Sequence, residues 1–170
     1  MESRENIVFL GMMGSGKTSI GILISKRLNL QFYDIDQIIE KELKMSISDI
    51  FNSRGEKFFR DLEERTTLKI LKKRGVVVSL GGGAFMNNQI RLKVLKSCTS
   101  IWLKVNLKSL IKRYKKNDRR PLLNTRKTDV DLKKMYELRK KIYRFANFRI
   151  NCDNMRKSQV VDKILFLYEN

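Results

Sequence analysis

The residues with the clearest chemistry lie near the N-terminus, where positions 11–18 read Gly-Met-Met-Gly-Ser-Gly-Lys-Thr directly after an apolar stretch at 7–10. This is the G-x-x-x-x-G-K-[ST] pattern of a phosphate-binding loop, in the strand–loop–helix context that the pattern requires. Glycines let backbone N–H groups close around phosphate oxygens, the lysine adds a mobile cation, and the threonine hydroxyl can bind Mg²⁺. A glycine-rich turn before an amphipathic helix is the structural alternative. The sequence predicts a nucleotide-binding loop followed by a helix from about Gly16, with nucleotide contacts from Gly14, Ser15, Gly16, Lys17, Thr18 and Ser19.

Two carboxylates follow the second apolar stretch, at Asp34 and Asp36. Alternation along an extended chain would turn both toward the position of the Mg²⁺ and the γ-phosphate. One could hold metal-bound water while the other accepts a hydrogen bond from an attacking hydroxyl. The residues alone leave a structural alternative open, in which Asp34 ends the strand and Asp36 caps a helix beginning near Gln37.

Two further features could bind a small polar ligand. Gly81-Gly82-Gly83 follows the apolar run at 76–80, and three glycines permit a tight turn that exposes bare backbone N–H groups. Arg60 stands on an expected helix with Glu63 and Glu64 three and four residues later, where either could fix the guanidinium by a salt bridge. On so charged a helix, a solvated surface pair remains the alternative.

The elements that must position these residues alternate along the whole chain. Apolar runs typical of strands lie at 7–10, 31–33, 76–80, 100–105 and 149–152, and helical periodicity lies at 15–28, 58–73, 88–95, 107–115, 130–145 and 159–168. This order predicts an α/β protein with a three-layer α/β/α P-loop fold and a five-stranded parallel sheet. Such sheets bind ligands at the carboxyl ends of their strands, where the candidate residues stand. Residues 116–128 fit neither pattern, and we expect them to form a mobile lid.

Composition limits the remaining possibilities. A chain of 170 residues, 42% of them hydrophobic, can form one domain over residues 1–170, and it has no apolar run of the roughly 20 residues that cross a bilayer. The N-terminus lacks a signal-peptide layout, so we expect a cytoplasmic protein without a membrane partner. Cys98 and Cys152 lack metal-ligand spacing and are expected to be buried free thiols. The absence of histidine excludes histidine bases and triads.

The net charge of +19 raises the question of a nucleic-acid partner. The excess is concentrated in residues 104–157, which hold 19 basic and 5 acidic side chains. Much of it comes as lysine pairs that are typical of solvated helix faces, and no aromatic-rich recognition module accompanies it. We therefore expect no nucleic-acid substrate.

Taken together, the motifs carry a family resemblance in their order and spacing. They are the P-loop with its Met-Met pair, Asp34-x-Asp36, the run Ser46-Ile47-Ser48-Asp49-Ile50-Phe51 leading to Gly55-Glu56-x-x-Phe59-Arg60-x-x-Glu63, the triple glycine, and Arg120-Pro121-Leu122-Leu123. Over nearly its full length the chain resembles shikimate kinase, a small P-loop kinase of the nucleoside monophosphate kinase structural class. The resemblance implies transfer of the ATP γ-phosphoryl group to the 3-hydroxyl of shikimate, a step of aromatic amino-acid biosynthesis, with Mg²⁺ required. It also implies a small-molecule substrate and a monomer.

The resemblance implies roles for the nucleotide side of the site. Lys17 would contact the β- and γ-phosphates, Thr18 would ligate Mg²⁺, and Asp34 would act on the metal through water. Arg120 would move in with the lid to neutralise transition-state charge, with its neighbour Arg119 as the competing candidate. By the same analogy Arg113 and Arg156 would flank the adenine, although each stands among basic residues typical of a solvated face.

The resemblance also implies roles on the acceptor side. Asp36 would bind the ring hydroxyls and orient or deprotonate the attacking one. Arg60, held by Glu63, would pair with the shikimate carboxylate in a planar bidentate contact. The backbone of Gly81, Gly82 and Gly83 would contact the substrate hydroxyls. Arg139 resembles the second carboxylate-binding arginine, four residues before Tyr143, but Lys140-Lys141-Ile142 departs from the family, which usually has a proline there.

Three other functions share some of these features. Gluconate and nucleoside monophosphate kinases share the sheet and the P-loop, but a nucleotide acceptor does not explain Asp36, Arg60 and the triple glycine. A nucleic-acid-associated ATPase would explain the charge, yet such enzymes commonly carry a further strand ending in Asp, and 100–105 has no carboxylate. A nucleotide-binding module without activity is disfavoured by the intact Lys17 and Thr18.

Overall fold

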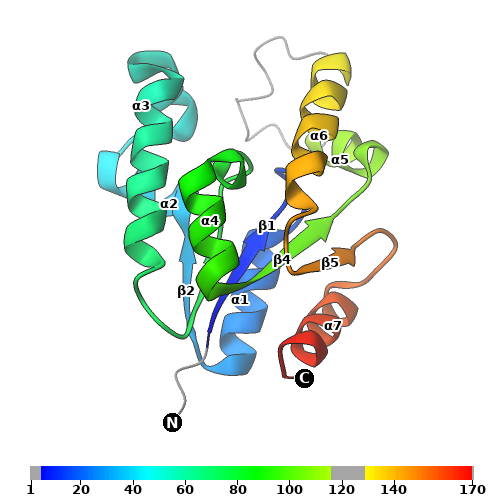
Figure 1. The fold of residues 1–170 in the computed structure, drawn as a ribbon. Helices are drawn as coiled ribbons and strands as arrows, with labels where there is room; N and C mark the ends of the chain where they lie inside the picture. The colour runs from blue at the N-terminus through cyan, green and yellow to red at the C-terminus, as the bar shows by residue number, and fades with distance from the viewer. Residues whose placement is uncertain (1–4, 116–128, 170) are drawn as a thin grey trace.

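The computed structural model describes residues 5–115 and 129–169, which form a five-stranded parallel sheet with helices on both faces (Figure 1). The strand order is β2-β3-β1-β4-β5, and each neighbouring pair is parallel. The strands are β1 (Asn6–Leu10), β2 (Gln31–Asp34), β3 (Val76–Ser79), β4 (Cys98–Lys104) and β5 (Phe148–Asn151). The predicted fold class and the five predicted strands are confirmed, with boundaries that move by one or two residues.

Seven α-helices and one short 3₁₀-helix are present among the described residues. They are α1 (Lys17–Leu28), α2 (Ile35–Leu43), α3 (Ile47–Ile70), η1 (Ala84–Met86), α4 (Asn88–Ser97), α5 (Leu107–Lys115), α6 (Asp129–Tyr143) and α7 (Lys157–Glu169). In the view of Figure 1, α4 crosses the front of the sheet and α1 lies behind it, where α1 also packs against α7. Because helices cover both faces, every residue of β1 and β3 is buried, and these strands are nearly continuous apolar runs.

One polar side chain inside this core aligns the two strands that lead to the candidate site. The Asn6 Nδ2 group donates to the Lys73 carbonyl oxygen (2.7 Å), and Asn6 Oδ1 accepts from the Val76 N–H (3.1 Å). Both polar groups of the buried amide are therefore satisfied. The contacts hold the start of β3 beside the start of β1, with Ile7 opposite Val77.

The segment after β2 is helical where the sequence pattern suggested an extended chain. Asp34 is the N-cap of α2, and its Oδ1 atom accepts from the Gln37 N–H (3.3 Å). Asp36 therefore lies in the first turn of α2, so neither the extended alternation nor the alternative of an Asp36 cap is correct. The physical reason is that an N-cap aspartate satisfies a free backbone donor and lets the helix begin one residue after it.

Helix α3 begins at Ile47, well before the predicted start at residue 58. Ser46 is its N-cap and accepts from the Asp49 N–H (3.1 Å). Gly55, at φ 82° and ψ 167°, interrupts the helix with a kink. The kink breaks the 3.6-residue periodicity, which is why the sequence pattern indicated only the second part of α3.

Three further predictions from the sequence concern the cysteines, membrane-spanning helices and the lid. Cys98 and Cys152 are both buried free thiols, as predicted. None of the helices in the described ranges has the length and apolar character needed to cross a membrane. The expected lid at 116–128, which contains Arg119 and Arg120, lies outside the described residues.

Candidate active site

The predicted phosphate loop joins β1 to α1 and folds around its own lysine. Gly16 has φ 98° and serves as the N-cap of α1, a conformation that glycine adopts without strain. The buried Lys17 donates through Nζ to the carbonyl oxygens of Gly11 (2.9 Å) and Met12 (3.0 Å). The first N–H groups of α1 and the lysine cation thus lie at one end of the loop, which is a site that favours anions.

A pocket of about 480 Å³ opens beside this loop at the carboxyl end of the sheet. Eight predicted site residues line this pocket, namely Gly14, Gly16, Lys17, Thr18, Ser19, Asp34, Asp36 and Gly82. The pocket is also lined by residues at the junction of α2 and α3 that the sequence analysis did not assign to the site, namely Gln37, Glu40, Ser46, Ile47 and Ser48. Ser46, Ile47 and Ser48 belong to the motif at 46–51 quoted for the family resemblance. That motif was the signal by which they could have been assigned to the site.

Thr18 and Asp34 meet at the edge of the pocket. The Thr18 hydroxyl donates to Asp34 Oδ2 at 2.6 Å, while Asp34 Oδ1 caps α2. The predicted metal pair is therefore brought together and rigidly oriented. Among the described residues no cluster of three or more Asp, Glu, His or Cys side chains could hold a metal ion alone. A hydroxyl and one carboxylate suit Mg²⁺, which usually binds one or two protein groups together with substrate phosphates and water.

Helix α5 holds the phosphate loop from the other side. Arg113 Nη1 donates to the Gly14 carbonyl oxygen (2.7 Å), and the Tyr114 hydroxyl donates to the Met13 carbonyl oxygen. Arg113 thus contacts the phosphate loop, and its place beside the adenine stays a prediction. Arg156 is exposed in the segment before α7, where its backbone N–H donates to Gln159 Oε1 (2.8 Å).

The glycine run, defined as Gly81–Gly83, follows β3 and is packed between the charged side chains predicted for the acceptor. A Cβ atom on Gly81 would lie 2.7 Å from Asp36 Oδ1, and one on Gly83 would lie 2.6 Å from Arg60 Nη1. A Cβ atom on Gly82 would lie 3.1 Å from Arg139 Nη1. The structure therefore brings Asp36, Arg60 and Arg139 to one strip of backbone where no side chain has room.

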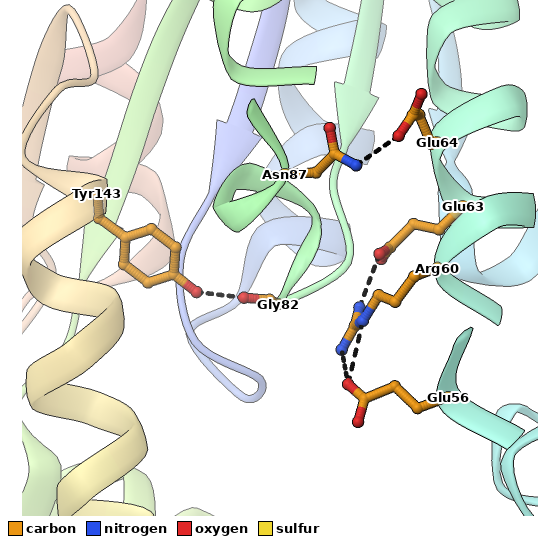
Figure 2. A network of polar contacts seen from close by, with 7 residues as sticks. All are labelled: Glu56, Arg60, Glu63, Glu64, Gly82, Asn87 and Tyr143. Carbon is orange, nitrogen blue, oxygen red and sulfur yellow. Dashed lines mark hydrogen bonds and ion pairs between the residues drawn. The ribbon is translucent and has the colours of Figure 1, made fainter. Parts of the chain in front are cut away.

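Arg60 is held by two glutamates of its own helix (Figure 2). It pairs with Glu63 at 2.7 Å and with Glu56 at 3.3 Å. Glu64, which the spacing also allowed, turns away and accepts from Asn87 Nδ2 at 2.6 Å, so that part of the prediction is wrong. Glu56 was not predicted as a partner, although its position four residues before Arg60 was a usable signal.

Two carboxyl groups of this site, the buried Glu63 and the half-buried Asp36, are desolvated, and their ionisation is correspondingly disfavoured. Burial raises the pKa of Asp36 to about 7, Glu63 and Asp34 add to the rise, and Lys17 opposes it. Burial also raises the pKa of Glu63, against the attraction of Arg60. Asp36 is thus a carboxyl group that can exchange a proton near neutral pH, as a hydroxyl-orienting or accepting group requires.

Two polar atoms beside the glycine run have no hydrogen-bond partner within the described parts of the chain. They are Glu63 Oε1 and Arg139 Nη1, and both atoms are buried. Unsatisfied buried polar groups cost stability and are rare unless a ligand or a function accounts for them. Gly82 lines the pocket of the phosphate loop, and Arg139 Nη1 lies beside Gly82. A phosphate loop with unsatisfied charged atoms near its pocket is the arrangement expected of a P-loop kinase with a small polar acceptor.

Comparison with known proteins identifies the family within that class. The family model for shikimate kinase matches residues 13–168. A curated shikimate kinase from Sulfurihydrogenibium sp. is 42% identical over 164 residues, covering 95% of this chain and 96% of that protein. The chain belongs to the shikimate kinase family, whose members are ATP-dependent phosphotransferases.

Solved structures agree with this assignment. A shikimate kinase from Acinetobacter baumannii, in complex with shikimate, superposes with a TM-score of 0.91 at 28% identity, over 98% of this chain and 93% of that one. A shikimate kinase from Aquifex aeolicus gives a TM-score of 0.85 at 34% identity, with 96% of each chain covered. The arrangement of sheet and helices around the pocket is therefore that of the family.

Proposed function

We propose that this chain transfers the γ-phosphoryl group of ATP to the 3-hydroxyl of shikimate, giving shikimate 3-phosphate and ADP. The observation that carries the proposal is the meeting of two half-sites at the carboxyl end of the sheet. The phosphate loop lies against Asp34 and Asp36, and the glycine run connects Asp36 to Arg60 and Arg139. Family membership and a structural relative solved with shikimate support the choice of acceptor.

On the nucleotide side, the backbone N–H groups of the loop and Lys17 bind the β- and γ-phosphates. Lys17 releases the Gly11 and Met12 carbonyl oxygens when it turns to the nucleotide. Thr18 and Asp34 would hold Mg²⁺, which would neutralise phosphate charge. Arg113, already at the loop, and Arg156 flank the adenine, and Arg120 contacts the γ-phosphate.

On the acceptor side, Arg60 and Arg139 bind the carboxylate of shikimate. Two guanidinium groups beside a strip of bare backbone suit a small carboxylic acid, because a guanidinium binds a carboxylate in a planar, charge-assisted contact. Glu56 and Glu63 hold Arg60 in position, and the partnerless Arg139 Nη1 atom supports a role in ligand binding. The N–H groups of the glycine run meet the ring hydroxyls.

Asp36 lies between the two half-sites and orients the attacking hydroxyl. Phosphoryl transfer depends mainly on positioning and charge stabilisation. A carboxyl group with a pKa of about 7 can accept a hydrogen bond from the hydroxyl and take up its proton as the new phosphate ester forms. Lys17 and bound Mg²⁺ favour the ionised form of Asp36 because both are cations.

The first test is ADP release from Mg·ATP in a coupled assay, with shikimate, gluconate or AMP as the acceptor in parallel reactions. We expect turnover that requires shikimate, and loss of that turnover when EDTA removes the metal ion. Turnover on gluconate or AMP without a response to shikimate would contradict the acceptor assignment. It would not affect the assignment of the nucleotide-binding residues.

We also propose that the enzyme is a cytoplasmic monomer. The resemblance to shikimate kinase implies a monomer, the cosubstrate ATP is cytoplasmic, and both cysteines are free thiols. Light scattering coupled to size-exclusion chromatography is expected to give a mass near 20.1 kDa, and a mass near twice that value would contradict the monomer.

A further inference from the structure

Tyr143, at the end of α6, contacts the glycine run and has no role in the proposed reaction so far. Its ring is buried, with 2% of the residue exposed, and its hydroxyl donates to the Gly82 carbonyl oxygen (Figure 2). Burial raises the pKa of the phenol well above its ordinary value, so the hydroxyl keeps its proton and acts as a donor. Helix α6, which carries Arg139, is thereby tied to the middle of the glycine run.

The direction of this hydrogen bond also determines the direction of the Gly83 N–H group. No described peptide bond is cis, so the carbonyl of Gly82 and the N–H of Gly83 point in opposite directions across one rigid plane. Because the carbonyl points to Tyr143 on one side, the Gly83 N–H points away from α6. In Figure 2 that is the side on which Arg60 and Glu63 lie.

The Gly83 N–H has no hydrogen-bond acceptor among residues 5–115 and 129–169, whereas the carbonyl oxygens of Gly81 and Gly83 accept from Ala84 and Met86. Glycine does little to hold a peptide plane by itself, because it populates more backbone conformations than any other residue. The following residues hold the peptide planes on either side, and the phenol holds the Gly82–Gly83 plane between them.

We propose that Tyr143 is a positioning residue that orients the Gly82–Gly83 peptide plane, and with it the Gly83 N–H, for the polar acceptor. The proposal rests on the proposed function, because the acceptor is the small hydroxylated carboxylate bound beside Arg60. Tyr143 does not touch the reacting atoms, and its effect on the reaction passes through the groups beside its hydroxyl, which are the Gly82 carbonyl of the glycine run and the Arg139 guanidinium.

The chain offers a closely matched control on the same helix. Tyr136 is also buried, with 7% of the residue exposed, and its hydroxyl donates to a backbone carbonyl oxygen, that of Val105 at 3.2 Å. Tyr143→Phe and Tyr136→Phe thus remove the same group from the same helix, and only the first removes a contact to the glycine run. A general loss of helix packing would affect both variants alike.

Steady-state kinetics with Mg·ATP and shikimate are the first measurement. For Tyr143→Phe we expect kcat/KM for shikimate to fall about fivefold, the scale of one lost hydrogen bond, while KM for ATP stays within twofold of the unmodified enzyme. Tyr136→Phe should leave kcat/KM for shikimate within twofold. Equal losses in both variants, or no loss in Tyr143→Phe, would overturn the positioning role.

Hydrogen exchange gives a second readout that needs no acceptor. Tyr143→Phe, but not Tyr136→Phe, is expected to speed deuterium uptake in the peptide that covers residues 81–86, because the peptide plane is released. Unchanged uptake there would overturn the inference even if no acceptor were turned over. Absent shikimate turnover in the unmodified enzyme would instead overturn the proposed function, so the two failures are distinguishable.

The single tryptophan checks that the ring of residue 143 stays in place. Trp102 on β4 lies 5.8 Å from the Tyr143 ring, measured between ring centroids. Tyr143→Phe keeps that ring, so the emission maximum of Trp102 should be unchanged. A shifted maximum together with altered kinetics would indicate displaced packing and would count against a specific role of the hydroxyl.

Discussion

Replacing Asp36 with asparagine should stabilise the fold, and the gain should grow with pH. The carboxyl group is half-buried beside Glu63 and Asp34, and desolvation together with these two charges raises its pKa from 3.8 to about 7. A group with a raised folded-state pKa binds its proton more tightly in the folded protein than in the unfolded chain. Ionising Asp36 therefore costs folding free energy above pH 4, and the cost is complete only above pH 7.

The size of the effect follows from those two pKa values. At pH 5 Asp36 is still protonated in the folded protein, and the fold is destabilised by only part of the full amount. At pH 8 the destabilisation is complete. Linkage gives a difference between pH 5 and pH 8 of about 3 kcal/mol in the free energy of unfolding. Asparagine has a similar shape and no charge, so the variant escapes this pH-dependent loss.

Urea unfolding at pH 5, 6, 7 and 8, followed by the fluorescence of the buried Trp102, measures the effect. The stability difference between Asp36→Asn and the unmodified protein should rise steadily across the series. Asp61→Asn is the matched control, because Asp61 is an exposed aspartate on α3, and its difference should stay flat. A flat or falling stability difference for Asp36→Asn would refute the explanation that desolvation and repulsion by Glu63 and Asp34 raise the pKa of Asp36. The same variant should lose most turnover, since it cannot accept the hydroxyl proton.

Three further substitutions test separate parts of the site. Arg60→Ala should lower kcat/KM for shikimate at least tenfold, or about 1.4 kcal/mol, with KM for ATP nearly unchanged; unaltered acceptor kinetics would remove Arg60 from the site. Lys17→Ala should abolish phosphoryl transfer while circular dichroism shows an intact fold, and substantial residual activity would contradict its phosphate role. Glu64→Gln weakens the contact to Asn87 and should lower the unfolding free energy by about 1 kcal/mol without changing acceptor KM, so a large KM effect would argue that Glu64 belongs to the site.

Local signals were sufficient for most of the fold. Buried parallel strands are continuous apolar runs, and helices repeat every 3.6 residues, so β1, β3 and most helices could be located from the sequence. The exceptions have local causes. Helix α2 is short and begins at an Asp that also ends β2, and the first part of α3 is separated from the rest by the positive-φ Gly55. Both features hide helical periodicity.

The site was predictable where a motif has its own geometry. Lys17 and Thr18 lie where the phosphate-loop pattern places them, because strand, loop and helix N-terminus are consecutive in the chain. The contact between Thr18 and Asp34 joins residues 16 positions apart. The sequence predicted only that both lie at the metal site, since parallel strands end at a common edge. The choice of Glu63 over Glu64 depends on how α3 is rotated against Asn87, which the spacing of charges does not encode.

The hydrogen bond from Tyr143 to Gly82 joins positions 61 residues apart, and no pattern in the sequence pairs them. Its location explains how the site tolerates its own electrostatics. Asp36, Glu63, Arg60 and Arg139 crowd around backbone that carries no side chains, and of these charges Arg60 and Glu63 pair directly at 2.7 Å. Flexible glycine would let that space collapse and would allow the partnerless Arg139 Nη1 and Glu63 Oε1 atoms to pair with the chain itself. A buried phenol that fixes the middle peptide keeps the strip open, and the unsatisfied groups remain available to the acceptor.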